Sequence, residues 1–275
     1  MKKTLFISII LVSSSIAFAQ MDTIVSNNDK VACQVKEITS DAVKYSFPGE
    51  DINSSMYKNA VQKIIFKNGR IQTFSEATAF KLIEKAADYE NVTITQVESE
   101  VRGLFKLGDA SAKAKGTTLI SNQERVKERA YRKFKIQAAM QGGNSIYLTN
   151  QRSNGNLEGG LYQMSTSAET SLTGVVYTNQ LPKYQEFIAL ISDKHNFMAI
   201  QELSLFSCFA DLTKCDIKKK FNIYNIKSEN GLIMIEGQIE GIPNYQKFRV
   251  VSFTKEHYTI FYENKSTQYN IIIKI

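Results

Sequence analysis

The sequence predicts a strand-rich α+β protein made of three consecutive units. Short alternating apolar and polar runs over residues 22–74 predict an N-terminal antiparallel β-meander. A four-residue apolar spacing from Val126 to Ala138 predicts one long helix in a middle α/β unit. Short strands at close spacing after residue 184 predict a C-terminal antiparallel β sandwich or small barrel.

Residues 1–19 have the pattern of a secretory signal peptide. Lys2 and Lys3 precede an apolar stretch that is too short for a stable membrane-spanning helix, which needs roughly 20 apolar residues. Small side chains at Ala17 and Ala19 predict cleavage between Ala19 and Gln20. We therefore expect an exported protein, periplasmic or secreted, whose mature chain has no transmembrane helix.

The composition narrows the class of partner. Without Lys2 and Lys3 the chain has 32 basic and 27 acidic residues, a net charge of +5. This small excess favours anionic envelope surfaces but gives little support to nucleic-acid binding, which export also opposes. The 3 prolines and the lack of a low-complexity tract argue against long disorder.

The first unit, residues 20–75, reads as short strands joined by polar turns. Asn68-Gly69 is a strong hairpin signal between two of them, and we expect both residues at positive φ. The triplet Asp22-Thr23-Ile24 resembles the acceptor of Bacteroidetes O-glycosylation, which implies an exposed start; the alternative is a plain first strand. Residues 76–90, with apolar positions at helical spacing, predict a connecting helix.

The middle unit, residues 91–180, is predicted to contain the long helix and several strands. Ser121 and Glu124 fit a capping box at its start. Its buried stripe would be Val126, Ala130, Phe134 and Ala138, and Gly142-Gly143 would end it. A strand is expected to begin near Val92, and others over 145–149 and 170–178.

The junction QAAMQGGNSIYLTNQ resembles the helix-to-strand junction of small bacterial envelope α/β modules, those of the Rcs stress-sensor lipoprotein and YbjQ-like type. The overall layout resembles uncharacterised exported proteins of Bacteroidetes. These resemblances imply a location in the envelope and no particular activity. The chain lacks a lipobox and has no cysteine in this unit, so lipid anchoring and disulfide chemistry do not carry over.

The C-terminal unit, residues 181–275, is again rich in strands. Asn230-Gly231 predicts a second hairpin. Residues 187–191 are expected to form a strand, and residues 197–206 a strand or equally a helix. Further strands are expected over residues 220–226, 232–239, 248–253, 258–262 and 269–274.

Three cysteines allow one disulfide bond in an oxidising compartment. Cys33 alternates with Val31 and Val35, which indicates a small buried hydrophobe on one strand face. Cys208 and Cys215 are the predicted pair. A turn over residues 210–213 would allow the bond, whereas a continuous helix there would hold the two Cα atoms about 10.5 Å apart and forbid it.

No residue is assigned a catalytic, cofactor-binding or metal-binding role. His195 and His257 lie outside zinc-binding spacings, and a site of His195 with Asp193, Cys208 and Asp211 is the weaker alternative to no metal site. On the helix, Arg125, Arg129 and Arg132 are a candidate basic patch for an anionic glycan or lipid. The competing interpretation is an ordinary solvated face, because Glu124 and Glu128 offset the charge.

We expect a non-enzymatic binding or interaction protein of the envelope or the medium, whose partner would be an envelope protein or an anionic glycan or lipid. The first alternative is a carrier that holds a small apolar ligand inside a C-terminal β-barrel. The second is a hydrolase, because catalytic groups can assemble from residues that are distant in sequence.

Overall fold

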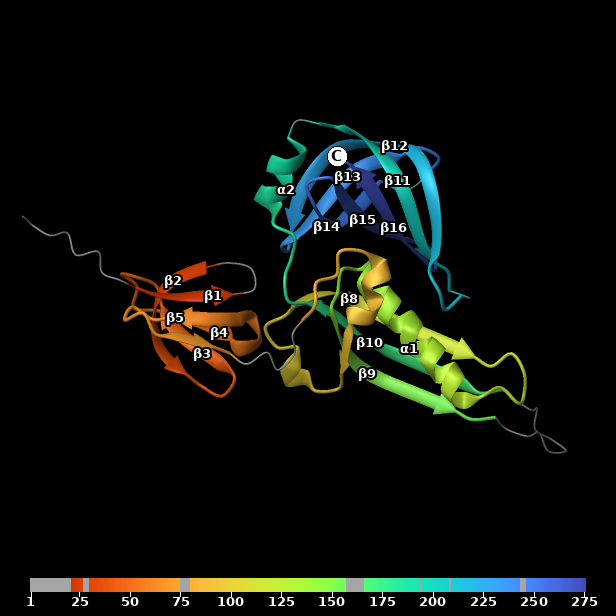
Figure 1. Cartoon of the computed structure of the whole chain (residues 1–275), viewed down its shortest axis with the longest axis horizontal. Helices are drawn as coiled ribbons and strands as arrows, with labels where there is room; N and C mark the ends of the chain where they lie inside the picture. Colours follow the sequence, from red (N-terminus) through yellow and green to blue (C-terminus); the bar gives the residue numbers. More distant parts are fainter. Residues whose placement is uncertain are drawn as a thin grey trace, which may run out of the picture.

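The computed structural model describes residues 21–26, 30–74, 80–156, 166–192, 194–207, 209–242 and 246–275. It confirms the α+β class, with an N-terminal sheet, a middle sheet with a long helix, and a C-terminal barrel (Figure 1). The expected signal peptide and its cleavage site at Ala19 and Gln20 lie outside the described residues, as do Asp193 and Cys208. Within the described ranges, no helix has both the length and the apolar character needed to cross a bilayer.

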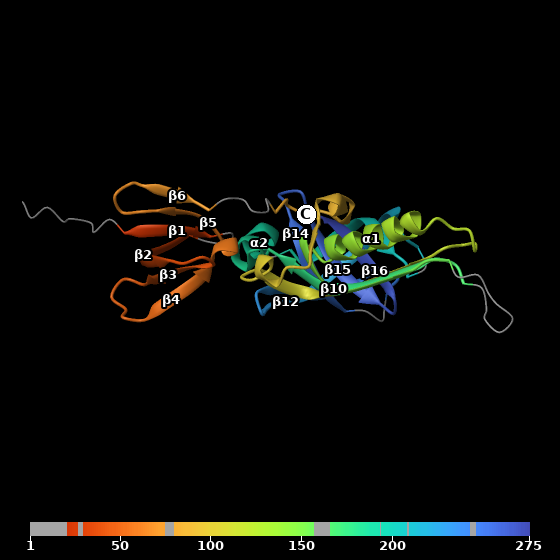
Figure 2. The same cartoon turned by 90° about the horizontal axis from the view of Figure 1, so that it is seen from below.

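The N-terminal unit is one antiparallel sheet of strand order β4-β3-β2-β1-β5-β6, whose strands are spread out between β6 and β4 in Figure 2. Its strands are β1 (Asp22–Ser26), β2 (Lys30–Ile38), β3 (Ala42–Ser46), β4 (Asn53–Tyr57), β5 (Val61–Ile65) and β6 (Ile71–Thr73). A short 3-10 helix, η1 (Lys58–Ala60), precedes β5. The core gathers around Ile24, Cys33, Val43 and Ile64, so Cys33 is the small buried hydrophobe that its strand pattern predicts.

The expectation of an exposed start at Asp22-Thr23-Ile24 is wrong. Strand β1 is an inner strand, paired with β2 on one side and β5 on the other. Ile24 is fully buried, and the carboxylate of Asp22 accepts hydrogen bonds from the backbone N–H groups of Val35 at 2.9 Å and Lys67 at 2.8 Å. The triplet therefore has a structural role in the core of the first sheet.

The two Asn-Gly hairpins differ in their turn. At Asn230-Gly231 both residues have positive φ, 51° and 80°, as a two-residue type I′ turn requires. At Asn68-Gly69 only the glycine does, with φ of 81°. There the N–H of Phe66 binds the carbonyl oxygen of Arg70 at 2.9 Å, which closes a three-residue loop, so the hairpin is confirmed but its expected turn geometry is wrong.

The expected connecting helix over residues 76–90 is absent from the described part of that segment. Residues 80–85 are not helical, and a 3-10 helix, η2 (Ala86–Asn91), follows. The Asp88 carboxylate accepts hydrogen bonds from the N–H groups of Glu84 and Lys85, both at 3.1 Å. An aspartate that binds nearby backbone amides in this way competes with α-helix formation, which explains the error.

The middle unit is a four-stranded sheet of order β7-β9-β10-β8. Its strands are β7 (Thr93–Thr95), β8 (Phe105–Lys115), β9 (Ser145–Asn154) and β10 (Glu169–Thr178), and a 3-10 helix, η3 (Glu98–Glu100), lies between β7 and β8. Helix α1 (Gln123–Met140) packs on one face through Val126, Ala130 and Phe134. The small alternating residues Ala110, Ala112 and Ala114 of β8 are buried in the same core.

Both ends of α1 are set by local hydrogen bonds. Its N-cap is Asn122, whose side chain accepts the N–H of Arg125 at 3.1 Å, so the capping box expected at Ser121 and Glu124 is wrong by one residue. At the C-terminus Gly142 has φ of 79° and the N–H of Gly143 binds the carbonyl oxygen of Ala138 at 2.8 Å. This Schellman ending confirms the predicted stop at the glycine pair.

The C-terminal unit is a closed six-stranded antiparallel barrel, in which β11 pairs with β16. Its strands are β11 (Asn196–Leu205), β12 (Thr213–Glu229), β13 (Leu232–Ile239), β14 (Lys247–Phe253), β15 (His257–Asn264) and β16 (Thr267–Lys274). The strand expected over residues 187–191 is instead part of helix α2 (Tyr184–Ile191). The Phe187 ring lies 5.3 Å from that of Tyr258, and this packing against the barrel core favours a helix with Phe187 and Ile191 on one buried face.

Barrel and middle unit are joined by an interface of mixed character. Ile136 and Met140 of α1 cluster with Leu203 and Leu205 of β11. Arg249 of β14 crosses the junction and donates to the carbonyl oxygens of Leu107 and Gln141, both at 2.9 Å. Its burial lowers the pKa of this guanidinium to about 10. Barrel and sheet are therefore fixed against each other by specific polar contacts as well as by apolar packing.

Candidate binding site

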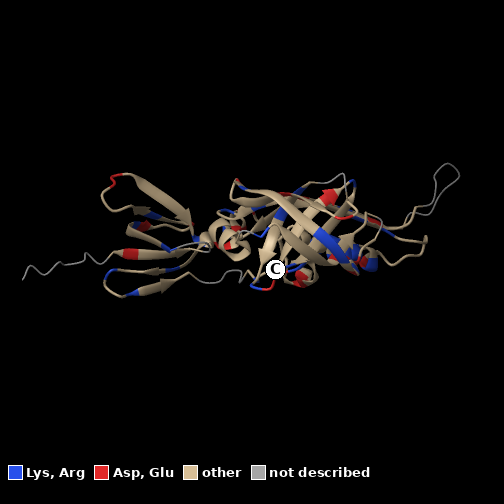
Figure 3. Ribbon diagram, turned by 90° about the horizontal axis from the view of Figure 1, so that it is seen from above, with Lys and Arg blue, Asp and Glu red and all other residues tan. Residues whose placement is uncertain are grey.

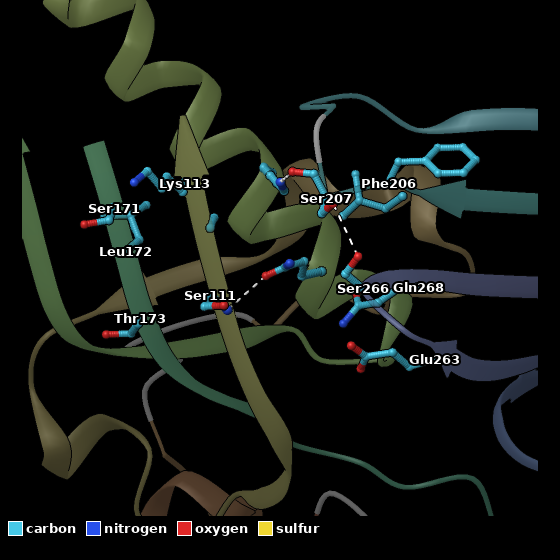
Figure 4. A pocket seen from close by; sticks show the side chains of 14 residues that line it. Ser111, Lys113, Ser171, Leu172, Thr173, Phe206, Ser207, Glu263, Ser266 and Gln268 are labelled. Atoms are coloured by element: carbon cyan, nitrogen blue, oxygen red, sulfur yellow. Dashed lines mark hydrogen bonds between the residues drawn. The ribbon is translucent and has the colours of Figure 1, made fainter. Parts of the chain in front are cut away.

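A cavity of about 340 Å³ lies between the middle unit and the barrel (Figure 4). One side is formed by β8, β10 and α1. The other is formed by the end of β11 with the residues after it and by the β15–β16 hairpin. Ten of its fourteen lining residues have polar side chains, although apolar atoms make up most of the exposed wall, and this volume lies within the range of small-molecule pockets. The polar members are Ser111, Lys113, Lys133, Gln137, Ser171, Thr173, Ser207, Glu263, Ser266 and Gln268.

Two of these polar side chains are held deep in the wall. Lys133 is 5% exposed, and its ammonium donates to the main-chain carbonyl oxygen of Ser207 across the junction. Gln268 is 7% exposed, and its side-chain oxygen Oε1 has no hydrogen-bond partner among the described residues. A buried carbonyl oxygen without a donor is costly, so a donor supplied by water or by a ligand would stabilise it.

Strand β8 forms the sheet edge beside the cavity, and side chains bind along this edge. Gln141 donates to the carbonyl oxygen of Asp109 at 3.1 Å, and the Gln137 side chain accepts the N–H of Ser111 at 3.0 Å. Arg129 donates to the carbonyl oxygen of Lys115 at 2.6 Å. These contacts satisfy edge groups that an unpaired strand would otherwise leave open.

The predicted basic patch is not assembled as one free surface. Arg129 donates to a carbonyl oxygen at the edge of β8, and Arg132 forms an ion pair with Asp211 at 3.0 Å. Arg125 lies at the exposed start of α1. Figure 3 shows Lys and Arg interspersed with Asp and Glu over the three units. The structure thus favours structural contacts for two of the three arginines.

The disulfide bond expected between Cys208 and Cys215 stays a prediction. Cys215 lies exposed on β12 with a free thiol, and Cys208 is outside the described residues. Residue 215 pairs with Glu202 of β11, so the continuous helix considered for this region is absent from its described part. Burial raises the pKa of the Cys33 thiol to about 11, which keeps it protonated and unreactive.

The two histidines lie away from the cavity. His195 is exposed just before β11, and its carbonyl oxygen accepts the N–H of Ile223 at 2.8 Å. His257 begins β15, with its Nδ1 3.2 Å from the hydroxyl of Thr254. Among the residues that the structure describes, no group of three or more His, Cys, Asp or Glu side chains has the geometry of a metal site.

The barrel interior is filled by its own side chains. The rings of Phe221 and Phe248 lie 5.3 Å apart and those of Phe248 and Tyr262 5.5 Å apart, in edge-to-face contact. Tyr258 is fully buried among them, and burial raises the pKa of its phenol. Edge-to-face aromatic packing of this kind belongs to a solid core.

Sequence reasoning missed the strand that carries the site. In β8, alanine alternates with polar residues, and this period of two could have indicated a strand. Alanine, however, is a weak strand former. It also missed that Arg129, Lys133, Gln137 and Gln141 recur at every fourth position beside the apolar stripe of α1. Comparison of the chain with family models, with curated proteins and with solved structures finds no match.

Proposed function

We propose that this protein is a non-enzymatic binding protein of the cell envelope or the medium, and that it holds a polar ligand in the cavity between the middle sheet and the barrel. The observation that carries the proposal is a cavity of about 340 Å³ whose lining residues are mostly polar and include the buried side chains of Lys133 and Gln268. The exposed hydroxyl groups of Ser207 and Ser266, 3.4 Å apart, offer further donors and acceptors at the rim.

The geometry gives less support to the hydrolase alternative. Serine hydroxyl groups and a buried lysine share the cavity wall, but the lysine amine donates to the backbone oxygen of Ser207. A nucleophile needs a base within hydrogen-bond reach of its own proton, and this contact does not supply one. The carrier alternative loses support because aromatic side chains occupy the barrel interior.

Ligand binding is tested with defined probes on the full mature chain. Maltotriose, chitotriose and an end-blocked trialanine are titrated separately, and binding is followed by protein NMR and thermal shift. The variant Gln268→Leu removes the unpaired oxygen, and we expect it to weaken binding of the recognised probe about tenfold, the effect of losing one buried hydrogen bond. Gln246→Leu, at an exposed glutamine before β14, is the matched control and should bind as the wild type does.

Two results would contradict the proposal: no probe binds at all, or the recognised probe binds Gln268→Leu as tightly as the wild type. Export is tested separately, by N-terminal mass analysis of protein made in its native host. Cleavage before Gln20 is expected from the small residues at Ala17 and Ala19, and a retained Met1 would contradict it.

A further inference from the structure

The side chains along α1 match the edge of β8 in register. Four helix residues rise about 6.0 Å, and two strand residues advance about 6.6 Å, so every fourth residue of α1 meets every second residue of an antiparallel β8. The observed contacts follow this rule: Arg129 meets Lys115, Gln137 meets Ser111 and Gln141 meets Asp109. The remaining pair in this register is Lys133 with Lys113.

Lys133 makes no hydrogen bond to the main chain of Lys113, unlike the other three pairs. Lys133 donates instead across the cavity, to the carbonyl oxygen of Ser207 on the barrel side. Because the carbonyls of Asp109 and Lys115 and the N–H of Ser111 all point to the open edge, alternation places both main-chain groups of Lys113 on that edge as well. Among the described residues, neither the N–H nor the C=O of Lys113 has a hydrogen-bond partner on this open edge.

The uncovered part of the edge opens directly into the cavity. Ser111, Ala112 and Lys113 all line it, and Figure 4 shows the strand passing between the side chains of the sheet and those of the β15–β16 hairpin. Natural proteins usually cover such an edge, because its free N–H and C=O groups recruit another strand. Here four side chains bind the main chain of β8 on both sides of Lys113, and Arg249 is the one that binds Leu107. The four are Arg129, Gln137, Gln141 and Arg249.

We infer that the ligand of this cavity is a short extended peptide, which pairs as an added strand with the main chain of β8 at Lys113. A peptide presents alternating N–H and C=O groups at the spacing of the open edge groups, whereas sugar hydroxyls have no such repeat. Its other edge faces the barrel wall, which Gln268 and Ser266 line. Small side chains fit best, since Ser111, Ser171 and Thr173 form the sheet side of the cavity.

This inference rests on the proposed function and is tested with a substitution of the main chain. Lys113→Pro removes the free N–H that points into the cavity and leaves the ladder to β10 intact, since proline is tolerated on the open side of an edge strand. Lys113→Ala removes the same side chain, with its 2.8 Å ion pair to Glu169, but keeps the N–H and is the matched control. The probe is end-blocked trialanine, beside an analogue that is methylated on its backbone nitrogens.

We expect trialanine to bind the wild type and Lys113→Ala within about threefold of each other, and Lys113→Pro about tenfold or more weakly. The methylated analogue should bind poorly, and bound trialanine should slow hydrogen exchange of the Lys113 amide in the wild type. Thermal melting of the three proteins checks that each is folded.

Equal binding to Lys113→Pro, or binding of the methylated analogue as tightly as trialanine, would overturn the inference. If maltotriose or chitotriose binds through Gln268 and trialanine does not, the peptide inference fails and the proposed function stands. If none of the probes binds, both fail.

Discussion

Replacing Arg249 by methionine and by lysine measures how the barrel is joined to the middle unit. The guanidinium donates to two carbonyl oxygens at 2.9 Å, and two charge-assisted hydrogen bonds are together worth about 3–6 kcal/mol. It also lies 5.0 Å from the ring centre of Phe261, a contact worth about 1 kcal/mol. Against this, burial lowers the pKa of the guanidinium to about 10, which corresponds to a desolvation cost of about 3 kcal/mol.

These magnitudes predict an order of stability at pH 7 that chemical similarity would not. Arg249→Met loses the hydrogen bonds and the stacking contact but also removes the desolvation cost, for a net loss of about 1–4 kcal/mol. Arg249→Lys keeps a buried charge, but one ammonium does not reproduce the planar fork or its stacking, so it should lose about 2–4 kcal/mol. The wild type should therefore be the most stable protein, and lysine should be no better a replacement than methionine.

The pH dependence has a definite sign. The folded pKa of Arg249, about 10, lies below the unfolded value, so the unfolded chain holds more protons in the pH range between these two values. Stability contributed by neutral Arg249 is present above that range and is lost as the pH falls through about 10. The difference in unfolding free energy between wild type and Arg249→Met should consequently grow as the pH is raised through 10.

Urea titrations followed by tyrosine fluorescence give these free energies, and the chain contains no tryptophan to obscure them. Arg70 is the matched control site, because it stacks at 4.0 Å on Phe66 in the N-terminal sheet without crossing an interface. Its methionine and lysine variants should each lie within about 1 kcal/mol of the wild type. A lysine variant at residue 249 that is as stable as the wild type would refute the reasoning.

Two further predictions concern the N-terminal sheet and the thiols. Asp22→Ala leaves the N–H groups of Val35 and Lys67 without their acceptor and should destabilise the first sheet by about 2–4 kcal/mol in urea titrations. The control Asp51→Ala, at an exposed position, should have little effect, and equal effects of the two substitutions would contradict the role of Asp22. In native protein at pH 8, Cys215 should react readily with a thiol reagent, whereas Cys33 should react only after denaturation, because it is buried with a pKa of about 11. Rapid labelling of Cys33 in the native protein, detected by mass spectrometry of its peptides, would contradict this prediction.

The sequence by itself determined the features that depend on neighbouring residues. The apolar spacing of Val126, Ala130 and Phe134 predicted α1, because a helix places every fourth side chain on one face. Gly142-Gly143 predicted its end, because the required positive φ is accessible to glycine. The alternation around Cys33 likewise placed that thiol in a sheet core.

Local pattern failed where packing against distant residues set the conformation. Residues 187–191 form part of a helix because Phe187 packs against Tyr258, seventy-one positions along the chain, and the same apolar run would also suit a strand. β8 was missed because its alanines are weak strand formers that become strand residues by packing under α1.

The candidate site could come only from the tertiary structure. Its walls belong to elements that the sequence keeps far apart, as the bond from Lys133 to Ser207 across 74 positions illustrates. The polar residues at every fourth position of α1 are visible in the sequence, but their partners on β8 are not. Lys133 binds Ser207, whereas Arg129, Gln137 and Gln141 bind the edge of β8. This difference depends on where the barrel sits, because hydrogen bonds form between groups that folding brings within about 3 Å.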